Sequence, residues 1–260
     1  MKNIRILLSF LLLFGIYLGL SCDKNTTSSE AEINPLDSTP RENAEAEWAA
    51  LFLSGELVAP DSVYNKVLLG LNQLQEFYAS SVPEVRISFY YPTYYSDISI
   101  MLDDSARDLV RSGDYIAWDS LNQFYGVTQV DTLSIDHYFV ATIRFSGRLN
   151  TSLVCANYNS LPGVWYADAA ASQAGDRPKK YITLKNGLLS FLIRNAWGDC
   201  PAGCPYSHYF YFKQTNDSMV YVGDWNPQTT ETPPEWWDEA DDMFYEYAEY
   251  FRYFCGDSIQ

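Results

Sequence analysis

The sequence predicts an α+β fold in which helices flank a set of antiparallel strands. Residues 61–78 carry apolar side chains three and four positions apart, which is the period of an amphipathic helix. From residue 85 onward apolar and polar residues alternate, as they do in half-buried strands. The helical period returns after Trp237. These changes of period predict both helices and strands within one chain.

The first 21 residues have the composition of an export signal. Lys2 and Arg5 precede a mostly apolar stretch from Ile6 to Leu20, which is shorter than the roughly 20 residues that a membrane-spanning helix needs. Cys22 follows directly, and this arrangement resembles the acylation site of bacterial lipoproteins. The resemblance implies a signal peptide over 1–21, a lipid (palmitate) on Cys22, and attachment to a membrane of the bacterial cell envelope, at its periplasmic face or at the cell surface.

The next segment, 22–39, is polar and without apolar period, so we expect a flexible tether. A single α+β globular region is expected over 40–260. Its first helix should begin at the capping box Thr39-Pro40-Arg41-Glu42 and end near Gly55. A second helix should begin at Asp61, and its apolar stripe should be buried.

The centre of the chain, 85–169, is predicted to be a ferredoxin-like split βαβ unit. Val85 to Tyr91 alternates as a strand does, and Asp103-Asp104 opens a short helix. The later elements are expected as strands over 127–135 and 138–145, a helix capped by Asn150, and a strand over 163–169. If Ile98 to Leu102 is discounted, the order is strand, helix, strand, strand, helix, strand.

Residues 174–260 predict an antiparallel β meander followed by an amphipathic helix. The Asn186-Gly187 pair between apolar runs is a strong hairpin signal, and further strands are expected near 208–213 and 219–222. The final helix should follow a second capping box, Thr232-Pro233-Pro234-Glu235. Its stripe of apolar residues is more typical of packing on a sheet than of a ligand surface; it comprises Trp237, Ala240, Phe244, Tyr247, Phe251 and Phe254.

A second resemblance concerns the segment 149–168. Its run from Tyr158 to Asp168, with Leu161-Pro162-Gly163-Val164, is similar to the closing helix and strand of subtilisin-type protease propeptides. Such propeptides have a ferredoxin-like fold and inhibit or chaperone their protease. No subtilisin catalytic domain follows, so the resemblance implies mainly a fold and, as an alternative function, an inhibitor-like module.

The cysteines outside the signal predict two disulfides. Cys155, Cys200, Cys204 and Cys255 form an even set in an exported chain, and we favour the pairs Cys200–Cys204 and Cys155–Cys255. The stretch from Trp197 to Cys204 resembles a motif of uncharacterised bacterial exported lipoproteins, which implies location and a disulfide loop. A zinc site of Cys200, Cys204 and His208 is the weaker alternative, because export disfavours the reduced thiols that zinc needs.

Charge and missing motifs narrow the classes of function. The formal net charge of −16 disfavours nucleic-acid binding, since phosphate backbones would repel the chain. No nucleophile-elbow, zinc-protease, phosphate-loop or dinucleotide motif occurs, and we expect no cofactor. The acidic residues Asp103, Asp104 and Asp119 could serve acid–base chemistry, but capping of helices explains them better. His137, beside Asp136, is more typical of a surface residue than of a base.

We therefore expect a lipid-anchored envelope protein without catalytic activity that binds a protein or a glycan. The anchor, the tether and an aromatic content of 16 % motivate this expectation, because tyrosine and tryptophan suit binding interfaces. A protease-inhibitor or propeptide-like chaperone module is the alternative. An unrecognised extracytoplasmic hydrolase is the third reading, because the two carboxylates of a glycosidase can lie far apart in sequence.

Overall fold

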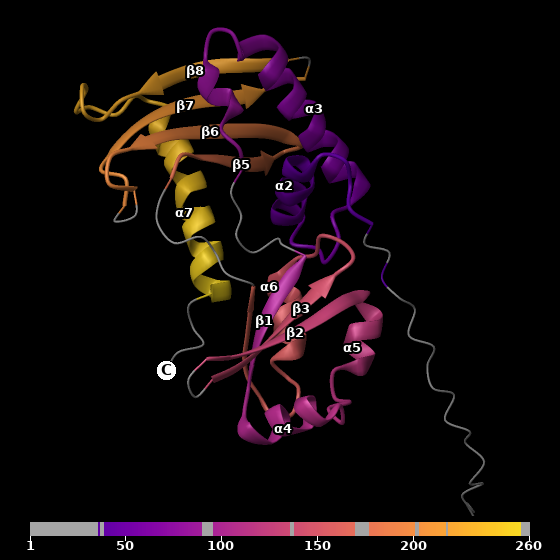
Figure 1. Ribbon diagram of the computed structural model, residues 1–260. Coiled ribbons are helices and arrows are strands. Elements are labelled where there is room, and N and C mark those ends of the chain that lie inside the picture. The colour runs from indigo at the N-terminus through magenta and orange to yellow at the C-terminus, as the bar shows by residue number, and fades with distance from the viewer. Residues whose placement is uncertain are drawn as a thin grey trace, which may run out of the picture. The chain divides into compact units, whose positions relative to one another are not determined.

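The protein is an α+β molecule with two four-stranded antiparallel sheets (Figure 1). The computed structural model describes residues 36, 39–89, 96–135, 138–169, 177–200, 203–216 and 218–255, and the side chains of all of these except 135 and 247–255. The expected signal peptide, Cys22 and most of the expected tether lie outside this part. Within it, no helix has the length and apolar character needed to cross a membrane.

Two helices open the described chain, as the sequence predicts. α2 spans Ala44–Ser54 and α3 spans Asp61–Tyr78. The predicted cap of the first helix is wrong: Asn43, not Thr39, is the N-cap, and its side-chain oxygen accepts a hydrogen bond from the amide of Ala46 at 2.9 Å. Asparagine caps a helix as well as threonine does, so the choice between the two is decided by where the helix packs.

The strand predicted from Val85 to Tyr91 is also wrong. A short 3₁₀ helix, η1, occupies Pro83–Arg86, and residues 87–89 form no strand; residues 90–95 lie outside the described part. Val85 and Phe89 are buried against the core beneath α3. Their alternation therefore reflects packing of an irregular segment, and proline at the start of η1 supplies the φ that such a turn needs.

The first sheet is built from residues that follow this segment. Its strand order is β2-β3-β1-β4, and every neighbouring pair is antiparallel. The first strand is the one that the sequence pattern discounts, so the unit begins at Asp97 rather than at residue 85. The order of elements agrees with a split βαβ unit, and the ferredoxin-like assignment itself stays a prediction. The elements are β1 (Asp97–Leu102), α4 (Asp104–Ser112), α5 (Asp119–Phe124), β2 (Val127–Ile135), β3 (Tyr138–Phe145), α6 (Thr151–Tyr158) and β4 (Val164–Ala169).

One face of this sheet forms the core of the unit. Ile98, Ile100 and Leu102 of β1 alternate with half-buried residues and point to the same side as Ala141 and Ile143 of β3. Side chains from α4 and α6, such as Ala106 and Tyr158, complete this core. The helices therefore cover one face of the sheet.

A glycine holds α4 against the start of β4. Gly163 has φ +75°, and its carbonyl accepts a hydrogen bond from the amide of Asp103 at 2.8 Å. A Cβ atom placed there would lie 2.5 Å from the Cβ of Ala106 and 3.1 Å from Oδ1 of Asp103. Both the backbone conformation and the lack of space therefore require glycine at this position.

We predict that Gly163→Ala lowers the free energy of unfolding by about 2–3 kcal/mol, because a strained φ and a steric contact add together. Gly113→Ala is the matched control, since Gly113 has φ +82° but nothing within 4 Å of the new methyl group. That control should cost only about 1 kcal/mol. Urea unfolding of the two variants measures the difference, and equal costs would show that β4 and α4 are not in contact in solution.

The second sheet is a meander, β5-β6-β7-β8, with antiparallel neighbours throughout. Asn186-Gly187 forms the predicted two-residue turn between its first two strands. The final helix begins at Trp237, two residues after Glu235, and no cap from Thr232 is formed there. The elements are β5 (Lys179–Lys185), β6 (Leu188–Trp197), β7 (Tyr206–Gln214), β8 (Met219–Trp225) and α7 (Trp237–Cys255).

Helices cover both faces of this meander. α3 packs so closely on one face that a Cβ on Gly70 would lie 2.7 Å from Leu189, and the Tyr78 hydroxyl donates to the Met219 carbonyl at 2.9 Å. On the other face Tyr181 contacts Phe244 of α7, with ring centroids 5.6 Å apart. The predicted packing of the C-terminal stripe is thus confirmed for Trp237, Ala240 and Phe244; the side chains of Tyr247, Phe251 and Phe254 lie outside the described part.

Candidate functional site

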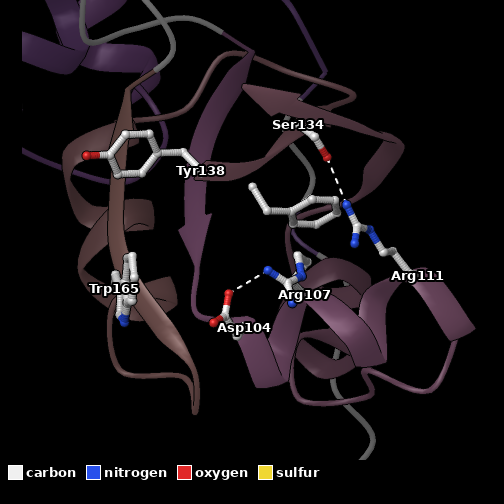
Figure 2. Close-up of a pocket in the computed structure, with 7 residues that line it drawn as sticks. Asp104, Arg107, Arg111, Ser134, Tyr138 and Trp165 are labelled. Carbon is white, nitrogen blue, oxygen red and sulfur yellow. Dashed lines mark hydrogen bonds and ion pairs between the residues drawn. The ribbon is translucent and has the colours of Figure 1, made fainter. Parts of the chain in front are cut away.

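A pocket of about 420 Å³ lies at one end of the first sheet, where β1 leads into α4 (Figure 2). α4, the end of β2 and the starts of β3 and β4 meet there, so strand ends and a helix face surround the pocket. Pockets of this size typically bind small molecules rather than folded proteins. The lining residues are Asp104, Arg107, Arg111, Ser134, Tyr138, Phe139 and Trp165.

Two arginines project into the pocket from one face of α4, four residues apart in the sequence. Arg107 is neutralised locally, because its guanidinium forms ion pairs with Asp104 and, at 3.0 Å, with Asp108. Arg111 is different: no carboxylate among the described residues forms an ion pair with it. One Nη atom of Arg111 donates to the Ser134 hydroxyl at 3.0 Å, which leaves its other donors available.

The position of Arg111 is fixed from two sides. The hydrogen bond to Ser134 connects α4 to β2, and the guanidinium carbon lies 5.2 Å from the centre of the Phe139 ring, within cation–π range. Phe139 itself is buried in the core of the sheet. A planar guanidinium held in this way is prepared to bind a carboxylate or phosphate through two parallel hydrogen bonds.

Two exposed aromatic rings form the opposite side of the pocket. Trp165 is 62 % exposed and Tyr138 is 52 % exposed, which is unusual for rings of this size. Trp165 owes its exposure to a β-bulge: Met101 and Leu102 of β1 pair with Tyr166 and Val164, so Trp165 is the extra residue of β4. Bulges commonly redirect a side chain at functional sites.

The acidic residues beside the pocket cap α4, as the sequence predicts. Asp103 is the N-cap, and its Oδ1 accepts hydrogen bonds from the amide of Ala106 and the hydroxyl of Ser105, both at 2.8 Å. The Ala106 amide, and then the Ser105 hydroxyl, lower the pKa of Asp103. Asp119 begins α5. Among the described residues of the pocket lining Asp104 is the one carboxylate and is paired with Arg107, so these residues do not supply the two acidic groups of a glycosidase.

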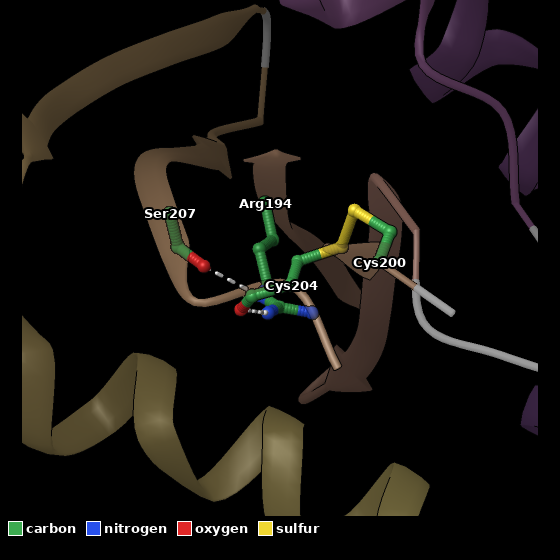
Figure 3. Close-up of a disulfide and its surroundings, with 4 residues drawn as sticks. All are labelled: Arg194, Cys200, Cys204 and Ser207. Atoms are coloured by element: carbon green, nitrogen blue, oxygen red, sulfur yellow. Dashed lines mark hydrogen bonds between the residues drawn. A yellow bond between two sulfur atoms is a disulfide. The ribbon is translucent and has the colours of Figure 1, made fainter. Parts of the chain in front are cut away.

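The short disulfide predicted in the Trp197–Cys204 motif is confirmed. Cys200 and Cys204 are bonded in the loop between β6 and β7, and Figure 3 shows the bridge beside the side chain of Arg194. The buried Arg194 guanidinium donates to the Cys204 carbonyl at 3.3 Å and to the Ser207 hydroxyl at 2.8 Å. The loop therefore has a structural function in covering a buried cation.

The alternative zinc site is not formed, because the sulfurs of Cys200 and Cys204 are bonded to each other. His208 instead lies on β7 with Nε2 2.6 Å from Oδ2 of Asp224 on β8. The Tyr221 hydroxyl donates to the other oxygen of Asp224 and, as the largest cause, lowers the pKa of that carboxyl. Across the described residues no group of three metal-ligating side chains converges.

The remaining predicted residues are separated or lie outside the described part. Cys155 is buried in α6, whereas Cys255 ends α7 with its side chain outside the described residues, so the Cys155–Cys255 pair stays a prediction. Asp136 and His137 also lie outside. Of these residues the structure describes the side chain of Cys155 alone, and it does not line the pocket.

Neither the two arginines nor the two aromatic rings of the pocket were predicted from the sequence. A signal for the arginines was present, because positions 107 and 111 are four residues apart and so share one face of the predicted helix. No comparable signal existed for Trp165, because the bulge that exposes it depends on pairing with β1. Comparisons with known proteins find no matching family model, no matching curated protein and no matching solved structure.

Proposed function

We propose that this protein is a non-catalytic, lipid-anchored module of the bacterial cell envelope that binds an acidic glycan in the α4 pocket. The observation that carries the proposal is Arg111, a positioned guanidinium without a carboxylate partner among the described residues, facing two exposed rings. In a chain of net charge −16, a local positive group of this kind selects for a negatively charged ligand.

The two sides of the pocket account for the two parts of such a ligand. Arg111 offers paired donors to the carboxylate of a uronic acid. Trp165 and Tyr138 offer flat apolar surfaces with a polar edge, on which the face of a sugar ring can lie. The modest volume of the pocket favours one or two sugar units over a folded protein.

The direct test measures binding by isothermal titration of the purified full chain with galacturonic acid oligomers and with their methyl esters. The esters keep the sugar and remove the charge. We expect the acid form alone to bind, and we expect Arg111→Ala to weaken it by about 10- to 100-fold, which corresponds to a hydrogen bond to a charged group. Trp165→Ala should also weaken binding of the acid form, because it removes the ring on which the sugar face lies.

Matched controls come from elsewhere in the chain. Arg144→Ala removes an exposed arginine of β3 whose guanidinium donates to Gln129, and Trp197→Ala removes a tryptophan that is 43 % exposed near the disulfide loop. Neither should change binding. Equal binding of acid and ester, or an Arg111→Ala variant with unchanged affinity, would refute the proposal.

A protease-inhibitor module is a second candidate, favoured by the strand order of the first sheet and by the propeptide-like segment 149–168. Its test is the addition of micromolar purified protein to a subtilisin-type protease. Unchanged peptide hydrolysis removes this candidate and leaves the glycan-binding proposal intact.

A further inference from the structure

β5 is an edge strand of the meander: it pairs with β6 on one side, and no strand of the described residues pairs with it on the other (Figure 1). It pairs with β6 in unbroken register from Lys179 to Lys185. An edge strand of this length presents a row of backbone groups that can accept another strand.

The hairpin turn determines which backbone groups of β5 point away from β6. With the two-residue turn Asn186-Gly187, Lys185 and Leu188 form the hydrogen-bonded pair next to the turn, and hydrogen-bonded pairs then alternate along the ladder. The amides and carbonyls of Ile182 and Leu184 therefore point away from β6. No described residue forms a backbone hydrogen bond with them on that outer side.

These outward groups lie along a groove of about 330 Å³, which we call the β5 groove. It is lined by Phe52 and Leu53 of α2, residues 182–185 of β5, and Glu246 of α7. α2 contacts β5 through Lys180 and α7 contacts it through Tyr181, and because successive side chains of a strand point to opposite faces, the two helices lie on opposite faces of β5. A strand added in the groove would thus gain backbone hydrogen bonds at its floor and an apolar wall on the α2 side.

The other edge of the sheet lacks these features. β8 carries a bulge opposite Tyr211 and Phe212, and such irregularities discourage strand addition. β5 has no bulge and no proline. Lys180, the second residue of β5, is turned inward to Glu45 at 2.9 Å, so its charge does not shield the edge, and the other two lysines, Lys179 and Lys185, stand at the ends of the strand. The contrast marks the β5 groove as the edge left open.

We propose that the β5 groove binds an extended peptide segment of a partner protein, which adds to the sheet as a fifth strand. Peptide recognition by strand addition uses the backbone for affinity and alternate side chains for specificity. Apolar residues of the peptide would face Phe52 and Leu53. Basic residues would face Glu246 and the acidic face of α7. The side chain of Glu246 is half exposed, and its Oε1 lies 3.7 Å from Nζ of Lys185, so the two form only a long ion pair.

A second copy of this chain fits less well than a peptide. The helices that wall the groove stand on both faces of β5, so only a slender segment reaches its backbone. Two chains of net charge −16 also repel each other. Charge and shape both favour a basic and apolar peptide in extended form.

The test uses three labelled hexapeptides with the full chain: alternating lysine and valine, alternating glutamate and valine, and the lysine peptide with every second amide N-methylated. Fluorescence anisotropy should show binding of the lysine peptide alone. N-methylation should weaken it at least about tenfold, because backbone donors are removed. On wild-type protein, the unmethylated lysine peptide should slow hydrogen exchange of the Ile182 and Leu184 amides.

Variants locate the binding. Leu53→Arg, which fills and charges the apolar wall, should abolish binding, and Glu246→Gln should weaken it about threefold. Val220→Arg on the β8 edge and Arg111→Ala in the α4 pocket should leave it unchanged. Failure of the lysine peptide to bind at millimolar concentration, or unchanged exchange at Ile182 and Leu184, overturns the proposal. Dimerisation abolished by Leu53→Arg would overturn it in favour of a second copy.

Discussion

Arg148→Ala is expected to lower the free energy of unfolding by about 3 kcal/mol, because it leaves a buried carboxylate without its cation. Glu47 of α2 has only 3 % of its side chain exposed, and its Oε2 lies 2.6 Å from Nη1 of Arg148. The same oxygen accepts a hydrogen bond from the Arg41 amide at 3.2 Å, which cannot replace a positive charge. Urea unfolding followed by tryptophan fluorescence measures the loss.

The matched control is Arg144→Ala, which removes an exposed arginine from β3, the strand that Arg148 follows, and should change stability by less than about 0.5 kcal/mol. The double variant Glu47→Gln with Arg148→Met removes both charges and should recover most of the loss, because neutral groups need no counter-ion. A cost below about 1 kcal/mol for Arg148→Ala would mean that the pair is not formed in solution.

This pair also connects elements far apart in the chain. Arg148 follows β3 and reaches α2, and the amide of Asn150 donates to the Leu57 carbonyl at 3.0 Å beside it. A further bond joins the Leu36 amide to the Phe124 carbonyl at the end of α5. The predicted tether therefore has an attached residue at position 36, ahead of its expected end at 39.

Local signals predicted most elements of the fold, because each depends on residues close in sequence. Asp103 and Gly113 bound α4 as N-cap and C-cap, and Asn186-Gly187 specifies its turn without reference to the rest of the chain. The segment 85–91 failed because alternation shows which residues are buried, whereas strand formation needs a partner strand. Pairing is a long-range property that this pattern does not contain.

The candidate site was less predictable for the same reason. The approach of Ser134 to Arg111 depends on the register of β2 and β3, and the exposure of Trp165 depends on a bulge against β1. Buried ion pairs follow the same rule, since Glu47 and Arg148 are separated by 101 residues. Composition showed an acidic chain, but only the fold shows which few charges are buried.

Glu45→Gln is expected to cost about 3 kcal/mol as well, because Lys180 then keeps a buried positive charge without its partner. Lys180 of β5 is 1 % exposed, and its Nζ lies 2.9 Å from Oε1 of Glu45. The Phe89 amide donates to the same oxygen at 3.2 Å. Glutamine keeps an oxygen acceptor for Phe89, so this substitution isolates the loss of charge.

The pH dependence of stability in Glu45→Gln shows whether the buried charge of Lys180 causes the loss. Burial lowers the pKa of Lys180, and Glu45 opposes this effect, so removing the carboxylate should lower that pKa further. The unfolded chain then binds more protons than the folded one between the lowered pKa and the ordinary lysine value near 10.4. Stability of Glu45→Gln relative to wild type should therefore rise with pH over that range, by at most about 1.4 kcal/mol per unit.

The double variant Glu45→Gln with Lys180→Met decides between charge and packing. Methionine retains much of the apolar stem of lysine and needs no counter-ion, so the double variant should regain most of the stability and lose the added pH dependence. A double variant as unstable as Glu45→Gln alone would instead locate the cost in the Phe89 contact. The buried lysine would then have to be neutral in the folded protein, because a charged one at this depth requires the carboxylate.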